Sequence, residues 1–312
     1  MEIPNLYGIL IGCNQLRYID LIEKKTSTLN VIDKCCGVDA VHLTKEGELF
    51  YTIETYLDNG LTAGTYLREL FSGSSVFPGA SQLGSYIKHD GKIFGCGYDG
   101  LWEVTNQKKH IDGEELEEQR RLRLCEIETD SNGNLYVSAW HDKGRRTSTK
   151  IFSLREEGGR LALDSEIASY DTKGGNDHSF KFIPYNGVSI LSTILSTIDG
   201  DSVDLNHVEL LGSKNSHPTE KIAVLNLEGD TIDALTTMYA TTDIQMLRIN
   251  LKERALVEKG IMKTGLGRGD SYIESILPVT DENLHKRLKQ IGERNKGKVD
   301  EYQPLPAFSC LC

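Results

Sequence analysis

One short pattern recurs along this chain: an extended apolar run, a polar turn that contains glycine, and a second extended apolar run. Residues 124–141 show it most completely, because apolar and acidic residues alternate on the approach to the turn Ser131-Asn132-Gly133. Such alternation predicts a strand with one buried face, and two such runs around a glycine turn predict a β-hairpin. The pattern returns at residues 41–51, 86–94 and 181–191. The chain is therefore expected to be an array of one supersecondary unit.

Each unit is expected to begin with an innermost strand that carries a polar residue near its start. The starts follow one another at roughly 40–55 residues, near the period of four-stranded propeller blades. They lie near Val38, Gly84, Cys125, Asp177, Ile232 and Ile273. The last start has no hairpin after it, whereas the N-terminal region offers three strands, at residues 6–12, 16–22 and 28–32, that lack an innermost partner. We therefore predict an all-β, six-bladed β-propeller closed by N- and C-terminal strands in one blade, which removes exposed sheet edges.

A helical pattern replaces the strand pattern after Val279. Thr280 or Asp281 can cap the first turn, and Leu284, Leu288 and Ile291 fall on one face. The sequence thus predicts a single propeller domain over residues 1–280 and a short C-terminal amphipathic helix with a tail over residues 281–312. Residues 107–123 are mostly charged, so we favour a solvated connection there over a further helical turn.

Charge and composition exclude several classes of protein. The formal net charge of −11 disfavours a nucleic-acid partner, although residues 281–298 carry six basic side chains against three acidic ones. No apolar run approaches the ~18 residues of a membrane helix, so no membrane association is expected. The first residues lack the features of a secretory signal, and the 7 cysteines show no framework spacing. We therefore expect a cytoplasmic protein.

The hairpin over residues 130–138, Asp-Ser-Asn-Gly-Asn-Leu-Tyr-Val-Ser, resembles a repeat of six-bladed propellers of the gluconolactonase, NHL and strictosidine-synthase-like group. The resemblance covers this hairpin well and the others loosely, and it implies the fold, because the group contains both enzymes and scaffolds. Its lactonase members bind a divalent cation in the channel through acidic and Asn side chains. Where those members have Glu-Gly-Pro, this chain has Asp39-Ala40-Val41.

Propeller geometry predicts where binding residues lie. An innermost strand begins on the same face as the loop between the second and third strands, and in this chain those loops are long, whereas the first turns are short. Long loops on a rigid scaffold are common binding sites. The ligand-binding residues expected on this face are Tyr56, Ser85, Trp140, His141, Asp142, Arg145 and Arg146.

Four carboxylates are expected at strand starts around the channel mouth, namely Asp39, Glu126, Asp233 and Glu274. Converging carboxylates repel one another, so they attract a cation or retain a proton, and Ca²⁺ or another divalent cation is the cofactor they would hold. The alternative is that polar strand starts only hydrate a water-filled channel.

Two functions remain open from the sequence. The first is a non-catalytic binding propeller that docks a protein or small-molecule ligand on its long-loop face, with the basic helix as a second contact, because no nucleophile-plus-base motif is present. The second is a divalent-cation-dependent hydrolase of lactonase or esterase type, with its site at the channel mouth. In that enzyme the four carboxylates would bind the cation, and His178 would be the catalytic general base.

Overall fold

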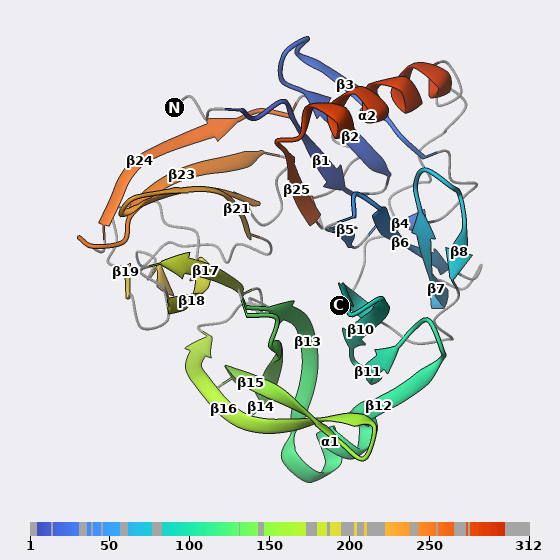
Figure 1. Cartoon of the computed structure of the whole chain (residues 1–312), viewed down its shortest axis with the longest axis vertical. Coiled ribbons are helices and arrows are strands. Elements are labelled where there is room, and N and C mark those ends of the chain that lie inside the picture. Colours follow the sequence, from blue (N-terminus) through green and yellow to red (C-terminus); the bar gives the residue numbers. More distant parts are fainter. Residues whose placement is uncertain are drawn as a thin grey trace.

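Short turns between alternating apolar runs fold the chain into a succession of sheets arranged around a common centre, as in a β-propeller (Figure 1). The structure is a computed structural model of the whole chain. The residues that it describes are 5–13, 15–30, 36–38, 40–44, 46–56, 62–76, 83–130, 132–142, 147–172, 180–185, 188–194, 203–204, 209–210, 222–237, 243–253, 255–264, 273 and 275–296.

In the described part of the chain the strands form six sheets, each written with its strands in pairing order. The first sheet consists of β25 (Ser275–Val279), β1 (Gly8–Gly12), β2 (Leu16–Asp20) and β3 (Lys25–Thr28). In the second sheet, β4 (Cys36–Gly37) and β5 (Val41–Leu43) both pair with β6 (Leu49–Tyr56), which is followed by β7 (Thr62–Glu69) and β8 (Ser75–Val76). The third sheet consists of β9 (Leu83–His89), β10 (Lys92–Gly97), β11 (Gly100–Glu103) and β12 (Lys108–Asp112). The fourth consists of β13 (Leu122–Thr129), β14 (Leu135–Asp142), β15 (Thr147–Glu157) and β16 (Arg160–Thr172). The fifth sheet consists of β17 (Lys181–Tyr185), β18 (Val188–Ile194), β20 (Glu209–Leu210) and β19 (Val203–Asp204). The sixth consists of β21 (Ile222–Glu228), β22 (Thr231–Thr237), β23 (Ile244–Asn250) and β24 (Ala255–Met262).

The pairing in these sheets shows a mostly antiparallel all-β fold. Five of the sheets are antiparallel throughout, which is the pattern of a propeller blade, whereas β18 and β20 pair in parallel in the sheet that contains β17. Two helices are also present in the described chain, α1 (Gly113–Arg120) and α2 (Glu282–Asn295). The described residues therefore form a β-propeller in which five of the sheets are antiparallel blades, with a C-terminal helix.

The first sheet joins the two ends of the chain. Strand β25 pairs antiparallel with β1, with Gly8 opposite Val279 and Gly12 opposite Ser275. The predicted closure by N- and C-terminal strands in one sheet is thereby confirmed. The third N-terminal strand lies earlier than predicted, at β3, because Asp20 accepts backbone N–H groups of Ile22 and Glu23, each at 2.9 Å, and tightens the turn.

Residues 222–228 correct the predicted succession of units. We expected a unit to start near Ile232, but β21 is the first strand of its sheet, and it contacts the first strands β17 and β25 of the neighbouring sheets. Gly229 has a φ of 58° and forms a polar-glycine turn that makes β21 and β22 a hairpin, and the packing of β21 against its neighbours places it innermost. Ile232 and its neighbours therefore lie in a second strand.

Residues 107–123 form a strand and a helix, so the prediction of a solvated connection was wrong. The Asp112 side chain caps α1 by accepting the N–H groups of Glu114 at 3.0 Å and Glu115 at 3.3 Å. Arg121 ends the helix in the left-handed conformation, and Leu116 is buried. The helix thus forms in a mostly charged segment, with one buried apolar side chain and a cap at each end.

The predicted C-terminal helix is confirmed as α2, and it packs into the core. Asp281 caps it by accepting the N–H of Leu284 at 2.6 Å. Leu284 and Leu288 are buried in one cluster with Leu10 of β1 and Tyr18 of β2. Figure 1 shows α2 lying across the first sheet.

Leu288→Ala tests how far the fold depends on α2. Because the Leu288 side chain is fully buried, its loss should lower the free energy of unfolding by about 2–4 kcal/mol. Gln290→Ala, on the exposed side of the same helix, should change it by less than about 0.5 kcal/mol. Urea unfolding measures both variants. Equal, small effects would mean that α2 does not belong to the core.

The hairpin of β13 and β14 is held by one carboxylate at its turn. Asp130 accepts the backbone N–H groups of Asn132 at 2.9 Å and Asn134 at 2.8 Å, the Asn134 side-chain amide at 2.9 Å and the Tyr136 hydroxyl at 3.1 Å. Gly133 takes a φ of 85°, which glycine adopts readily. Burial would raise the pKa of Asp130, but the hydrogen bonds outweigh it and lower the pKa below the ordinary value. The recurring Asp, Gly, Asn and Tyr of this motif are thus explained by the turn.

Asp130→Asn should destabilise the protein at pH 7 and much less in acid. A carboxyl whose folded pKa lies below its ordinary value of 3.8 contributes stability above that value and loses it as pH falls through the folded pKa. The difference in urea unfolding free energy between wild type and variant should therefore shrink from pH 7 to about pH 2.5. Asp164→Asn, an exposed control, should show little effect at either pH. A gap that is constant with pH would contradict the role of the Asp130 charge.

Candidate functional site

The two ends of the strands define two faces of the ring. Leu122, at the start of β13, lies opposite His141, near the end of β14, so strand starts and second-to-third connections share one face. We call this the loop face, and it also carries α1 and the turn between β10 and β11. The other face carries the first turns and α2, and we call it the helix face. The sequence predicted this division correctly for the sheet of β13.

Three side chains from three elements meet on the loop face. The guanidinium carbon of Arg123 (β13) lies 5.7 Å from the ring centroid of Tyr98 and 5.2 Å from that of Trp140 (β14). Glu117 of α1 accepts a hydrogen bond from the same guanidinium, and this bond raises the pKa of Arg123. Tyr98 is 55% exposed. We call these residues the Tyr98–Arg123–Trp140 cluster.

Glycines hold the Tyr98 turn in place. Gly100 has a φ of 107°, a conformation that other residues rarely adopt. A Cβ atom at Gly113, the first residue of α1, would lie 2.0 Å from the carbonyl oxygen of Tyr98. The helix therefore packs directly on the turn, and the cluster sits on a rigid support.

Two of the predicted site residues hold neighbouring sheets together. Ser85 Oγ on β9 accepts the backbone N–H of Ile127 on β13 at 3.2 Å. Glu126 Oε2 on β13 accepts the backbone N–H of Phe180, which precedes β17, at 2.9 Å. These side chains thus satisfy backbone groups of the next first strand, where an unpaired buried N–H would be costly.

The predicted cation ligand Asp233 is paired with arginine. It lies in β22, the second strand of its sheet, and is 5% exposed. Arg248 on β23 donates to both of its oxygens, from Nε to Oδ1 at 2.7 Å and from Nη2 to Oδ2 at 3.1 Å. This pairing raises the pKa of Arg248. Because β21 is the first strand of this sheet, Asp233 does not lie at the start of a first strand as predicted.

The remaining predicted residues are placed only in part. Trp140 and His141 lie near the end of β14, partly buried, and the backbones of Tyr56 and Asp142 end β6 and β14. The residues Asp39, Arg145, Arg146, His178 and Glu274 lie outside the described residues. In the described part of the chain, no group of three or more His, Cys, Asp or Glu side chains could hold a metal ion.

Sequence reasoning selected Trp140 but missed its two partners. Arg123 alternates in register with the buried residues of β13 and lies opposite Trp140 in the hairpin. The tetrapeptide Gly97-Tyr98-Asp99-Gly100 is a two-residue connection that presents an aromatic side chain. Both signals were available, but their convergence needs the packing of one sheet against the next.

Neither helix that the structure describes is long and apolar enough to cross a membrane.

Comparison with known proteins finds no matching family model and no matching curated protein. The solved structures that are similar to this chain include three at low identity. A protein of unknown function from Bacteroides caccae is 12% identical with a TM-score of 0.40, covering 88% of this chain and 100% of the other. A chain of a mitotic checkpoint complex is 11% identical with a TM-score of 0.33, covering 82% and 63%. A prolyl endopeptidase is 9% identical with a TM-score of 0.31, covering 82% and 31%. Similarity at this level says nothing about what this protein binds or does.

Asp233→Ala separates a structural role of this carboxylate from a metal-binding one. Removing it leaves Arg248 with Glu258 as an ion-pair partner, at 3.3 Å, so the unfolding free energy should fall by about 1–3 kcal/mol. The loss should be the same with and without EDTA. Asp164→Ala, which breaks an exposed pair with Arg155, should cost less than about 1 kcal/mol. A wild type that EDTA destabilises to the level of the variant would instead identify Asp233 as a cation ligand.

Proposed function

We propose that this protein is a non-catalytic binding module, a six-bladed propeller that docks a partner protein on its loop face. The sheet of β17 supports the sixth blade, because β17 contacts both β13 and β21, the first strands on either side of it. Cys13, Cys96 and Cys125 are present as thiols, which supports a reducing, cytoplasmic location.

The observation that carries this function is the Tyr98–Arg123–Trp140 cluster. Tyrosine, tryptophan and arginine are the residues most enriched at the energetic centres of protein interfaces. In this cluster the guanidinium lies over both rings, and its ion pair with Glu117 restrains its orientation. A pre-ordered arginine loses little side-chain entropy when a partner binds.

The position of the cluster also favours a partner protein. It joins the third and fourth sheets, and α1 flanks it, so a partner would contact several elements of one rigid surface. A protein interface needs such a continuous surface of roughly 800 Å² per partner. The exposed Tyr98 ring and the partly buried Trp140 ring would form its centre, and the charged residues of α1 its polar rim.

Tyr98→Ala tests the proposal with little risk to the fold, because Tyr98 is largely exposed. Bead-immobilised wild type should retain a defined partner from its native cell extract, and the variant should retain it at least about tenfold less. Val257→Ser removes an equally exposed apolar side chain (57%) from the outer strand β24 and should retain the partner fully. Quantitative mass spectrometry, followed by titration with the purified partner, measures the difference.

Two outcomes would reject the loop face as the docking site. One is a purified partner that binds the wild type and Tyr98→Ala with equal affinity. The other is a partner lost equally from Tyr98→Ala and Val257→Ser. Melting temperatures of both variants within a few degrees of wild type ensure that lost binding reflects the surface rather than unfolding.

A further inference from the structure

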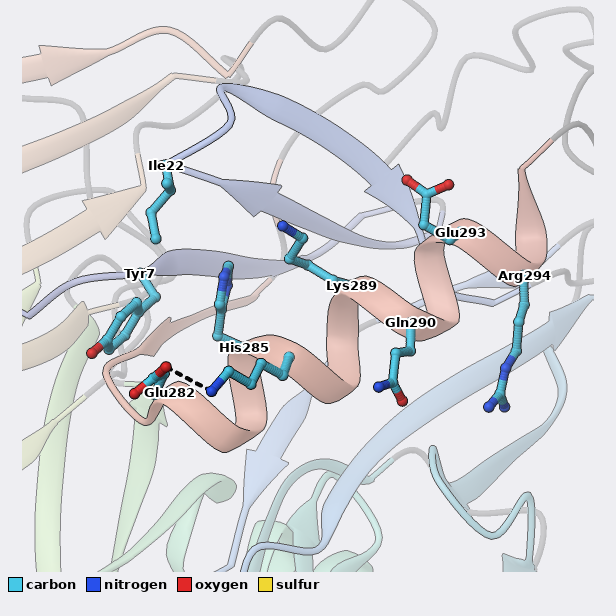
Figure 2. Close-up of a pocket in the computed structure, with 9 residues that line it drawn as sticks. Tyr7, Ile22, Glu282, His285, Lys289, Gln290, Glu293 and Arg294 are labelled. Atoms are coloured by element: carbon cyan, nitrogen blue, oxygen red, sulfur yellow. Dashed lines mark ion pairs between the residues drawn. The ribbon is translucent and has the colours of Figure 1, made fainter.

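A separate pocket lies on the helix face, between α2 and the turn that connects β2 and β3. Its volume is about 580 Å³, within the usual range of small-molecule sites. Figure 2 shows Ile22, Tyr7 and His285 at one end of it and Glu293 and Arg294 at the other. The Tyr98–Arg123–Trp140 cluster contributes nothing to it, because that cluster lies on the opposite face.

His285 is the buried polar group of this pocket. It is only 6% exposed, and its Nδ1 lies 2.5 Å from the hydroxyl of Tyr18 on β2. The Tyr7 ring stacks on the imidazole at 5.4 Å between centroids, with the planes 26° apart. The imidazole is therefore held in one orientation.

The Tyr18 contact occupies one of the two imidazole nitrogens. Burial, and then the charge of Asp20, raise the pKa of Tyr18, so its hydroxyl keeps its proton and can donate it to Nδ1. A neutral imidazole that accepts at Nδ1 carries its proton on Nε2. Among the described residues no partner is found for Nε2 of His285. Nε2 is thus the imidazole nitrogen left for a ligand, and it is an N–H donor when Tyr18 donates to Nδ1.

Cationic side chains also line the pocket. Lys286 pairs with Glu282 at 2.7 Å, and Lys289 pairs with Glu23 and lies 3.6 Å from Asp20. Each ammonium has three N–H groups, so the one carboxylate contact of Lys286 and the two of Lys289 leave N–H groups for a ligand. Arg294 also lines the pocket and has no ion-pair partner in the described chain. The lining thus has three cationic side chains and the carboxylates of Glu282 and Glu293, while Glu23 and Asp20 pair with Lys289.

Apolar groups line the same end of the pocket as His285. Ile22 is 63% exposed, although it is a large aliphatic residue, and the Tyr7 ring stands beside it. A ligand that consisted only of an anionic group would not contact the side chains of Ile22 and Tyr7. An aromatic or aliphatic body would cover them, with each buried methylene contributing about 0.8 kcal/mol.

We propose that this pocket binds a small organic anion, with an apolar ring or chain on one side and a phosphate or carboxylate on the other. The apolar body packs against Tyr7 and Ile22. The anion accepts hydrogen bonds from Nε2 of His285 and from the ammonium groups of Lys286 and Lys289. The site is independent of partner docking on the loop face.

Calorimetric titration of the full chain with phenyl phosphate and benzoate tests the site, with inorganic phosphate and phenol as the two halves of the probe. At least one aryl anion should bind saturably, at least about tenfold more tightly than either half. Lys286→Gln and Ile22→Ser should each weaken that binding about tenfold. Lys296→Gln, a charge-matched control next to α2 but outside the pocket, and Tyr98→Ala should leave it unchanged.

Three results would overturn the proposal. The first is no saturable binding of either aryl anion up to about 10 mM. The second is inorganic phosphate binding as tightly as phenyl phosphate, because the apolar side would then contribute nothing. The third is unchanged affinity in Lys286→Gln and Ile22→Ser, which would place the bound anion elsewhere. Both substituted residues are exposed, so the variants should fold, and thermal melting verifies this.

Discussion

The pairing of β25 with β1 is the constraint on which the ring depends. It joins Gly8 to Val279 and Gly12 to Ser275, residues from opposite ends of the sequence, with no covalent link between them. The contact is close: a Cβ atom at Gly12 would lie 2.7 Å from both the Ser275 hydroxyl and the Val38 carbonyl oxygen. Without this pairing β1 would expose an unpaired edge, and the sheet of β21 would lose its neighbour.

Helix α2 extends this closure from one sheet to the next. It follows β25 directly, buries Leu284 and Leu288 against the first sheet, and places Arg287 over the Phe71 ring of the second sheet at 3.4 Å. The amide of Asn295 also donates to the carbonyl oxygen of Leu29 at 2.9 Å. The same helix therefore stabilises the junction of the chain ends and forms one side of the pocket on the helix face.

Polar residues near the starts of first strands form hydrogen bonds between neighbouring sheets of the ring. Adjacent first strands face each other without a shared sheet, so some of their backbone N–H groups have no ladder partner. Ser85 and Glu126 accept two of these groups. His42 Nε2 on β5 accepts a third, from Lys88 on β9, at 3.4 Å. A polar side chain in a predicted channel can thus be required by the junction between sheets, which a sequence pattern does not reveal.

The sequence by itself determined the hairpins, the closure of the ring and the C-terminal helix, because each depends on short-range patterns. Alternation defines which face of a strand is buried, glycine permits the turns, and Asp130 and Asp281 bond to backbone groups within four residues of themselves. It also predicted that a first strand starts on the same face as the connection between the second and third strands, as in the sheet of β13. The tertiary structure alone decided which strand of each hairpin lies innermost, and hence that Asp233 faces Arg248 rather than the channel. It alone brought Tyr98, Arg123 and Trp140 together, since these contacts join residues of different sheets, and no local pattern specifies the distance between side chains that meet only when the ring closes.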